Sequence, residues 1–320
     1  MKTTHVSDCE PGEPDARAAW TRTRRRLERG RGRASGAPGR PRLRAFDVAV
    51  RCTDVALRTL GLYERGHRNA LDLQLVRYEH RFPDLPAALD GYRVLHLSDL
   101  HLDGMLEVVD RACALVRDEP VDLAVYTGDY REGYRGPCPE ALAALQQIMT
   151  AVDSRAGHVG VLGNHDGSEM VAPLEALGLR LLLNESIVLA RGDARVVIAG
   201  TDDPHDYPAA ADADLLQRVG ARVGPGDFYL ALIHSAELYD AAAAAGVDLY
   251  LCGHTHGGQI ATPRGRPLIT HLRRGHAFAS GLWRYGAMIG VTHRGVGTSG
   301  LPVRFYTRGE VVVHTLRRGE

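Results

Sequence analysis

The chain of 320 residues carries no net formal charge, with 39 Lys and Arg against 39 Asp and Glu, and 44% of it is hydrophobic. A chain of this length and apolar content can bury a large core, so we expect one principal domain. Its five cysteines stand far apart and form no Cys-x-x-Cys pair, which argues against a disulfide framework and a thiolate zinc site and indicates a reducing, cytoplasmic location.

The first 42 residues are rich in Arg, Gly, Pro and Ala and show no hydrophobic periodicity. Residues 1–45 hold 12 Lys and Arg against 5 Asp and Glu, so this end of the chain is basic. Such a composition predicts a disordered tail, with a contact to nucleic acid or anionic lipid as the less favoured alternative. We therefore expect that the tail contributes nothing to a catalytic site.

Residues 43–86 are expected to connect the tail to the main domain. From Leu43 to Leu62, apolar residues recur at helical spacing opposite several arginines, which predicts an amphipathic helix. Packing on the domain is the favoured interpretation, and peripheral contact with a membrane surface is the alternative. Its charges exclude a transmembrane span, and no other run approaches the roughly 18 apolar residues that a span requires. The alternating stretch from Leu71 to Tyr78 predicts an edge strand, followed by a connector.

Beyond residue 86, short apolar runs alternate with helical patterns, and we take residues 87–320 as the catalytic domain. The runs predict strands at residues 92–97, 121–126, 158–162, 195–199, 228–233, 247–252 and 287–291. Helical patterns lie near residues 104–118, 138–152, 168–178, 211–219 and 235–245. This alternation predicts an α/β domain. Two later runs, 301–306 and 310–316, have no helix between them, so we expect antiparallel strands at the end.

Residues with metal-binding side chains follow several of these apolar runs. Ligands collect beyond the carboxyl ends of strands in open α/β sheets, so we expect the residues to converge on one rim. They are two carboxylates, one amide and four imidazoles: Asp99, His101, Asp129, Asn164, His234, His254 and His256. This oxygen and nitrogen set suits Mn, Fe, Zn, Co or Ni. Seven ligands are too many for one ion, but with one carboxylate shared they supply four contacts to each of two divalent ions.

The same residues resemble the signature of the calcineurin-like metallophosphoesterases. Five blocks occur in that family's order between about residues 90 and 260: Asp-x-His, Gly-Asp-x-x-Glu, Gly-Asn-His-Asp, His and Gly-His-x-His. Glu132 is a departure, because aspartate is common at that place in the second block. The segments 253–259 (GHTHGGQ) and 295–304 (GVGTSGLPVR) are similar to a bacterial subgroup, some relatives of which hydrolyse the lipid-linked UDP-2,3-diacylglucosamine.

The resemblance implies a four-layer αββα sandwich of two mixed β-sheets flanked by helices. It also implies two ligand sets, which are Asp99, His101, Asp129 and His256 for one metal and Asp129, Asn164, His234 and His254 for the other. A hydroxide bridging ions about 3.5 to 4 Å apart would attack the phosphorus atom. His165 is then free to donate a proton to the leaving alkoxide, and Asp166 is expected to hold the tautomer and orientation of His165.

The predicted function is a dinuclear metal-dependent phosphoesterase that acts on a small or lipid-linked phosphate ester or on a pyrophosphate. The alternative is a non-catalytic adaptor that binds a membrane surface or nucleic acid and uses the domain as a scaffold. The complete ligand set argues against that alternative, because a domain without catalysis has no physical need for it. The acidic, Pro-containing stretch 202–206 predicts a turn and not a third metal site.

Overall fold

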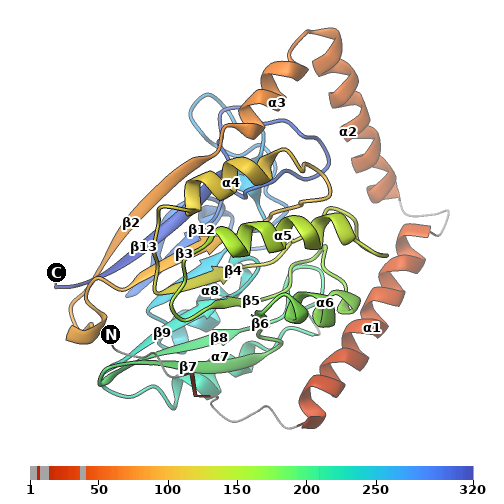
Figure 1. The fold of residues 1–320 in the computed structure, drawn as a ribbon. Helices are drawn as coiled ribbons and strands as arrows, with labels where there is room; N and C mark the ends of the chain where they lie inside the picture. Colours follow the sequence, from red (N-terminus) through yellow and green to blue (C-terminus); the bar gives the residue numbers. More distant parts are fainter. Residues whose placement is uncertain (1–5, 8–13, 37–40, 209, 320) are drawn as a thin grey trace.

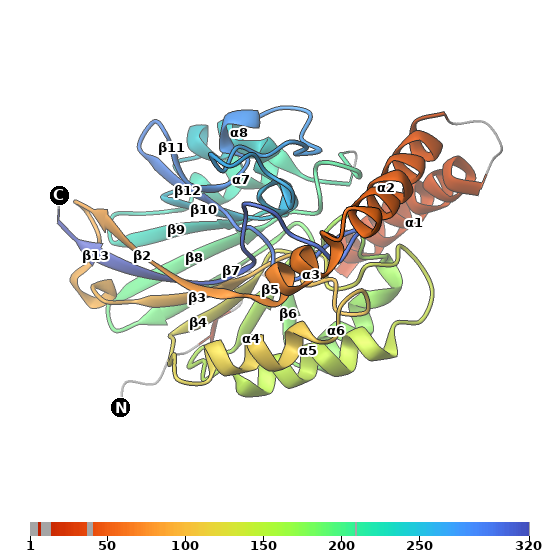
Figure 2. The same ribbon diagram turned by 90° about the horizontal axis from the view of Figure 1, so that it is seen from above.

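The computed structural model describes residues 6–7, 14–36, 41–208 and 210–319. Two mixed β-sheets pack face to face, and helices cover the outer face of each sheet (Figures 1 and 2). The predicted four-layer αββα sandwich is therefore confirmed.

The first sheet has six strands in the order β2-β13-β3-β4-β5-β6. Strands β3 to β6 are mutually parallel, and β13 is antiparallel to β3 but parallel to β2. The strands span β2 (Gln74–Phe82), β3 (Arg93–Leu97), β4 (Leu123–Tyr126), β5 (His158–Gly160), β6 (Leu179–Leu181) and β13 (Glu310–Arg318). Its outer helices are α4 (Val108–Val116), α5 (Pro139–Ala151) and α6 (Val171–Ala176).

The second sheet has seven strands in the order β1-β7-β8-β9-β10-β12-β11. The neighbouring strands β8, β9, β10 and β12 are mutually parallel. Strand β7 is antiparallel to β8, and β11 is antiparallel to β12. The strands span β1 (Val6–Ser7), β7 (Glu185–Arg191), β8 (Ala194–Gly200), β9 (Asp227–Leu232), β10 (Leu249–Cys252), β11 (Gly281–Tyr285) and β12 (Met288–Thr292). Its outer helices are α7 (Ala213–Gly220) and α8 (Tyr239–Ala244).

Strand β4 shows how the short apolar runs build this sandwich. Leu123 and Val125 belong to the core between the two sheets, whereas Ala124 and Tyr126 belong to the core under α4 and α5. Successive side chains of a strand point to opposite faces, so an uninterrupted apolar run serves both cores at once. The central strands are therefore held on both faces, and the loops that follow them start from fixed positions.

The N-terminal region differs from the sequence prediction. Residues 14–36 form helix α1 (Pro14–Gly36), so the expected disorder is wrong for this part of the tail, while residues 1–5, 8–13 and 37–40 lie outside the described residues. The charged face of α1 is the side that packs on the domain, which is why apolar periodicity did not reveal it.

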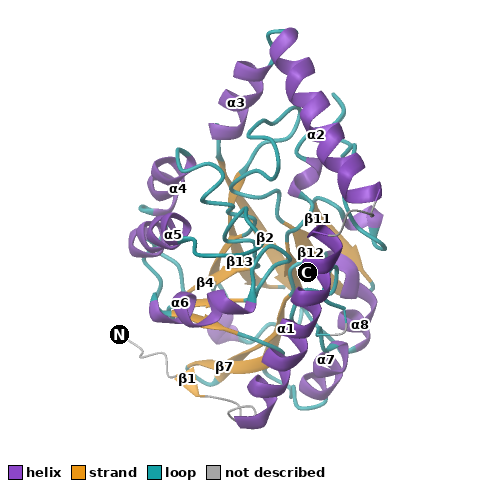
Figure 3. Ribbon diagram, turned by 90° about the vertical axis from the view of Figure 1, so that its right-hand side faces the viewer, coloured by secondary structure: helices purple, strands orange, loops and turns teal. Residues whose placement is uncertain are grey.

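Helix α2 (Pro41–Thr59) coincides with the predicted amphipathic helix and is followed by α3 (Tyr63–Leu71). It lies at the periphery of the molecule (Figure 3), and its Val48 and Val55, together with Leu60 just beyond it, are exposed. On the predicted apolar face, Val50, Thr53 and Leu57 are half-buried, and the Val50 side chain lies beside Gly300. The favoured expectation that this helix packs on the domain is therefore met only in part. Strand β2 lies at the edge of its sheet, as predicted. Among the described residues, no helix combines the length and the apolar content needed to cross a bilayer.

Three further differences concern strands. The sequence prediction missed β6, β7 and β11, each of which contains at least one charged residue. The run 301–306 forms no extended strand and makes only an isolated bridge between Phe305 and Ile260. The last strand, β13, is antiparallel to β3 only, because its other neighbour β2 runs in the same direction.

Candidate metal centre

All seven predicted ligands lie just beyond the carboxyl ends of neighbouring parallel strands. Asp99 and His101 follow β3, Asp129 follows β4, and Asn164 follows β5 in the first sheet. His234 follows β9, and the pair His254 and His256 follows β10, in the second sheet. All seven are buried. The structure thus brings together residues that are up to 157 positions apart in the sequence, as the strand-end argument predicted.

One group consists of Asp99, His101 and His256, whose candidate ligand atoms all lie within 4.8 Å of one another. The Nε2 atoms of His101 and His256 are 3.1 Å apart, and His256 Nε2 lies 3.5 Å from Asp99 Oδ1. Burial and the nearby His101 lower the pKa of His256 well below its ordinary value, which keeps the imidazole neutral and able to coordinate a cation.

A second group consists of Asp129, His234 and His254, again within 4.8 Å of one another. His234 Nε2 is 3.3 Å from Asp129 Oδ2, and the Asn164 Oδ1 atom is 3.0 Å from both His234 Nε2 and His254 Nδ1. The same Asp129 Oδ2 lies 3.6 Å from His101 Nε2 in the first group. Asp129 therefore stands between the two groups, at the position that a shared ligand would occupy.

These residues fit a pair of divalent cations. Carboxylate oxygens, imidazole nitrogens and the amide oxygen of Asn164 converge within short distances, and divalent metal ions take donor atoms of these kinds as ligands. His256 turns its Nε2 toward Asp99 and His101, and His254 turns its Nδ1 toward Asn164, so each ring offers one nitrogen to its group. The outer nitrogen of His234 is held by the carbonyl oxygen of Thr127 at 2.7 Å, which directs its Nε2 inward.

The backbone at the site adopts conformations that are unusual for residues with side chains. Five of the seven predicted ligands have φ in the left-handed region, with values of 51° for Asp99, 43° for His101, 56° for Asp129, 73° for His254 and 53° for His256. Each such residue costs roughly 1 to 3 kcal/mol relative to ordinary backbone. Unusual conformations of this kind cluster at functional sites, where the surrounding structure imposes them.

Two glycines allow the ligand loops to approach one another. A Cβ atom on Gly163 would lie 2.2 Å from Asp129 Oδ1, and a Cβ atom on Gly253 would lie 2.1 Å from Asp99 Oδ2. Both distances are far below van der Waals contact. The glycine that precedes each of Asn164 and His254 is thus required by the packing of one ligand loop on another.

Comparison with known proteins identifies the family. The model of the calcineurin-like phosphoesterase family matches residues 92–258, just over half of the chain and all seven predicted ligands. The chain belongs to this family. It is 28% identical to the uncharacterized metallophosphoesterase YkuE of Bacillus subtilis (strain 168), over 73% of this chain and 82% of that protein. It is 27% identical to the phosphodiesterase YaeI of Escherichia coli (strain K12), over 70% of this chain and 82% of that protein.

Among solved structures, a 5'-nucleotidase precursor from Thermus thermophilus aligns with a TM-score of 0.42 and 16% identity. The alignment covers 70% of this chain and 54% of that chain, so the present chain spans about half the length of that structure.

His165 lies beside the two ligand groups of this phosphoesterase. Its backbone N–H donates to Asp129 Oδ1 at 2.8 Å, and its Nδ1 lies 2.5 Å from the carbonyl oxygen of Glu132. The ring stacks on Tyr134 with 4.1 Å between centroids and meets the His101 ring edge to face. Burial lowers the pKa of His165, with the charge of Asp129 opposing that effect. The imidazole is therefore fixed in orientation through Nδ1 and through its faces.

Asp166 does not hold His165 in the way that we expected. Its carboxylate accepts backbone N–H groups from Asp129 and Gly163, both at 2.8 Å, and from Tyr130 at 3.0 Å. The contact to His165 Nδ1 comes from a backbone carbonyl, that of Glu132, so the expected role of Asp166 is wrong. Asp166 instead ties the loop after β4 to the loop after β5, because it binds N–H groups of both.

Glu132 is a site residue that the sequence reasoning noted only as a departure from the family pattern. Its Oε2 lies 2.9 Å from His101 Nδ1, and its Oε1 accepts the N–H of Gly300 at 2.8 Å. Burial opposes protonation of His101, but the carboxylates of Glu132, Asp129 and Asp99 together outweigh burial and raise the pKa of His101 to about 9. The signal that could have identified Glu132 as a site residue is its place in the second block, three residues after Asp129.

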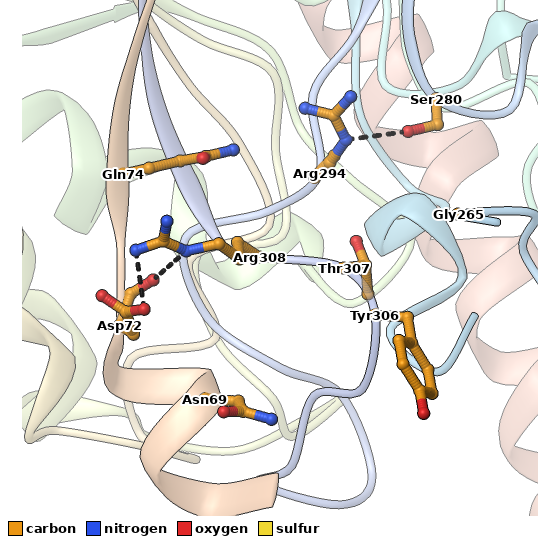
Figure 4. A pocket seen from close by; sticks show the side chains of 9 residues that line it. All are labelled: Asn69, Asp72, Gln74, Gly265, Ser280, Arg294, Tyr306, Thr307 and Arg308. Atoms are coloured by element: carbon orange, nitrogen blue, oxygen red, sulfur yellow. Dashed lines mark hydrogen bonds and ion pairs between the residues drawn. The ribbon is translucent and has the colours of Figure 1, made fainter. Parts of the chain in front are cut away.

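A separate cavity of about 480 Å³ has Arg294, Thr307 and Ser280 among its lining residues (Figure 4), and a Cβ atom on Gly257 would lie within 3.2 Å of all three. In it, Arg308 pairs with Asp72, and Arg294 donates to Ser280. It is lined by Asn69, Asp72, Gln74, Gly265, Ser280, Arg294, Tyr306, Thr307 and Arg308. None of the seven predicted ligands lines it, so this cavity is distinct from the metal centre.

Proposed function

We propose that this protein is a dinuclear metal-dependent phosphoesterase that hydrolyses a P–O bond of a phosphate ester or a pyrophosphate. The observation that carries the proposal is the position of Asp129 Oδ2, 3.6 Å from His101 Nε2 in one ligand group and 3.3 Å from His234 Nε2 in the other. A carboxylate placed in this way is suited to being shared by two neighbouring cations.

In this proposal each ion takes four protein ligands. One would be held by Asp99, His101, Asp129 and His256, and the other by Asp129, Asn164, His234 and His254. The donor set suits Mn, Fe, Zn, Co or Ni. When bound, two such ions supply positive charge for the phosphoryl oxygens and lower the pKa of the attacking water. The raised pKa of His101 means that a proton leaves this imidazole when it becomes a ligand.

His165 is the proposed proton donor to the leaving group. Its Nδ1 faces the carbonyl oxygen of Glu132 and therefore carries a proton, which leaves Nε2 to exchange a proton with the substrate. In the imidazolium form, Nε2–H would donate to the leaving alkoxide. The stacked ring of Tyr134 keeps the imidazole plane in one orientation during that transfer.

The substrate class in this proposal is a phosphate ester, either a small molecule or a lipid-linked one. The exposed apolar side chains of Val48 and Val55 on α2, with Leu60 beyond it, favour peripheral contact with a membrane surface over a purely solvated helix.

Hydrolysis of nitrophenyl phosphate mono- and diesters with added Mn²⁺ tests the proposal. We expect turnover that chelation abolishes and Mn²⁺ restores.

Asp129→Ala should lose both metal and activity, since the cations lose the charge between them. His165→Ala should retain about two metals per chain while kcat falls by roughly 10² to 10⁴. The loss should be largest for alkyl esters, whose leaving oxygen needs a proton most. A His165→Ala protein without metal would contradict its assignment as proton donor, and metal-independent turnover would contradict the proposed reaction.

A further inference from the structure

Helix α1 packs on the loop that carries Asn164 and His165, at the α6 end of the sandwich (Figures 1 and 2). The contact centres on Arg24, which is fully buried. Its Nη2 donates to the carbonyl oxygen of Gly163 at 3.1 Å and to that of Asp166 at 2.6 Å. These two carbonyls bracket Asn164 and His165, so one guanidinium group clamps both ends of the segment.

The charge of Arg24 is compensated within the same contact. Its Nη1 forms an ion pair with the buried carboxylate of Asp202, and its guanidinium lies 3.4 Å from the centroid of the Tyr207 ring. Trp20, one turn earlier on α1, donates its Nε1–H to the other oxygen of Asp202 at 2.8 Å. The acidic stretch 202–206 contains the predicted turn, at residues 204–206, and Asp202 also makes it the partner of α1. A buried polar network whose groups are all bonded is rigid, so these contacts restrict movement of the segments that Arg24 joins.

Neighbouring residues of α1 extend the clamp. Glu28, one turn after Arg24, accepts the backbone N–H of Ser168 at 2.7 Å and the Ser168 hydroxyl at 2.8 Å. Arg17 binds elsewhere, donating to Glu175 at 2.8 Å and to the carbonyl oxygen of Leu181 at 3.0 Å. Residues 163–168 are thus bonded to α1 at both ends, whereas Arg17 only anchors the helix to the body.

Helix α1 contributes little to the hydrophobic cores. Of its residues 16–30, whose burial the structure describes, only Trp20 belongs to a core, the one under α4 and α5. The bonds of Arg24 to the ligand loop therefore contribute more to the position of that loop than to the assembly of the sandwich.

We propose that Arg24 is a positioning residue for catalysis, and that α1 holds Asn164 and His165 in the geometry that hydrolysis requires. This inference rests on the proposed function, in which Asn164 binds a metal and His165 donates a proton. A shift of about 1 Å in such groups is enough to lower a rate by up to about 100-fold. The N-terminal segment is then part of the catalytic apparatus, although it contributes no group that touches the substrate.

The test compares Arg24→Met with the double variant Arg24→Met/Asp202→Asn, with Arg26→Gln as the control on the exposed face of the same helix. Arg24→Met leaves the Asp202 carboxylate buried without its partner, so both the urea midpoint and kcat should fall. In the double variant, the amide at position 202 removes that buried charge, and the amide oxygen can still accept the Nε1–H of Trp20. We expect its midpoint to recover while kcat stays about 10- to 100-fold below wild type, with KM within about threefold. Arg26→Gln should match wild type in every measurement.

Amide hydrogen exchange of the metal-free proteins gives a readout that does not depend on activity. Peptides covering residues 163–168 should exchange faster in both Arg24 variants than in wild type and Arg26→Gln. A double variant whose kcat recovers together with its midpoint would show a merely structural role and overturn the proposal, as would unchanged exchange in this segment. A wild-type chain that hydrolyses no ester with any of the candidate metals would overturn the proposed function instead, and the exchange experiment would still decide whether Arg24 holds the loop.

Discussion

Replacing Glu132 by Gln tests how His101 is prepared for a metal. In the structure, His101 Nδ1 has two neighbouring acceptors: the Glu132 carboxylate at 2.9 Å and the carbonyl oxygen of Arg131 at 3.0 Å. Both favour a proton on Nδ1 and so leave the Nε2 lone pair for coordination. The amide introduced by Glu132→Gln would keep an oxygen for the N–H of Gly300 but would turn its NH₂ group toward Nδ1, where two donors would face each other.

The expected loss of metal affinity depends on the hydrogen-bond acceptors that His101 Nδ1 keeps in the variant. Loss of an outer partner of a metal ligand typically lowers metal affinity or activity by about 10- to 100-fold. The Arg131 carbonyl still accepts from Nδ1 in the variant, so we expect the lower end, about tenfold, which corresponds to roughly 1.4 kcal/mol. Because His101 belongs to only one of the two proposed ligand sets, the affinity for one metal should fall, and the other metal should bind as in wild type.

Competitive metal titration with a chelating indicator measures both sites at once. Glu132→Gln should show one weakened step of two and a kcat that recovers when the metal concentration is raised about tenfold. Glu140→Gln, an exposed change at the start of α5, serves as the control and should bind metal as wild type does. Two unchanged steps in Glu132→Gln would refute the reasoning that this carboxylate fixes His101.

Three other outcomes are expected. Asp166→Ala should lose metal as well as activity, unlike His165→Ala, since three buried N–H groups of the ligand loops lose their acceptor; full metal content would contradict this. Burial, with a smaller effect of Arg284, lowers the pKa of His80 to about 4. As the pH falls from 6.5 toward 4, His80 therefore takes up a proton in the unfolded chain but stays neutral in the folded chain. The free energy of unfolding should therefore drop by about 2 kcal/mol at pH 5 from this residue, and His80→Gln should show a shallower pH dependence in urea titrations. The full chain should co-sediment with anionic vesicles at low salt through α2, and a Val55→Asp change should reduce that binding; no sedimentation at low ionic strength would end the membrane hypothesis.

The positions of the seven candidate ligands in the fold could be predicted from the sequence because two local signals coincide there. Each apolar run predicts a buried strand, and the polar residue that follows it predicts a ligand at the strand's carboxyl end. Pairing of β3, β4 and β5 in one sheet, and of β9 and β10 in the other, then brings Asp99, Asp129, Asn164, His234 and His254 together. The glycines of the motifs add a third signal, since close packing of the loops requires them.

The packing of α1 could not be predicted in the same way. Its inward face carries Arg17, Trp20, Arg24 and Glu28, at the spacing of a helix but with charged groups where a core-facing helix normally has apolar ones. Each of these residues bonds to a partner more than 130 positions away, and a single sequence gives no information about such pairs. The role of Asp166 could not be predicted for a related reason. Its partners are backbone N–H groups, which every residue but proline possesses, so the sequence does not single them out.

The strained ligand backbone and the helix clamp are two parts of one physical problem. Five ligands in the left-handed region cost together roughly 5 to 15 kcal/mol, a sum comparable to the whole stability of a typical domain. Such loops would relax if they were held only by their own chain. Asp166 joins two of them through three N–H groups, and Arg24 holds the carbonyls on either side of Asn164 and His165. Under the proposed function, these bonds to backbone atoms would hold the candidate ligands in place before a cation binds, because Asp166 and Arg24 are not themselves among the proposed ligands.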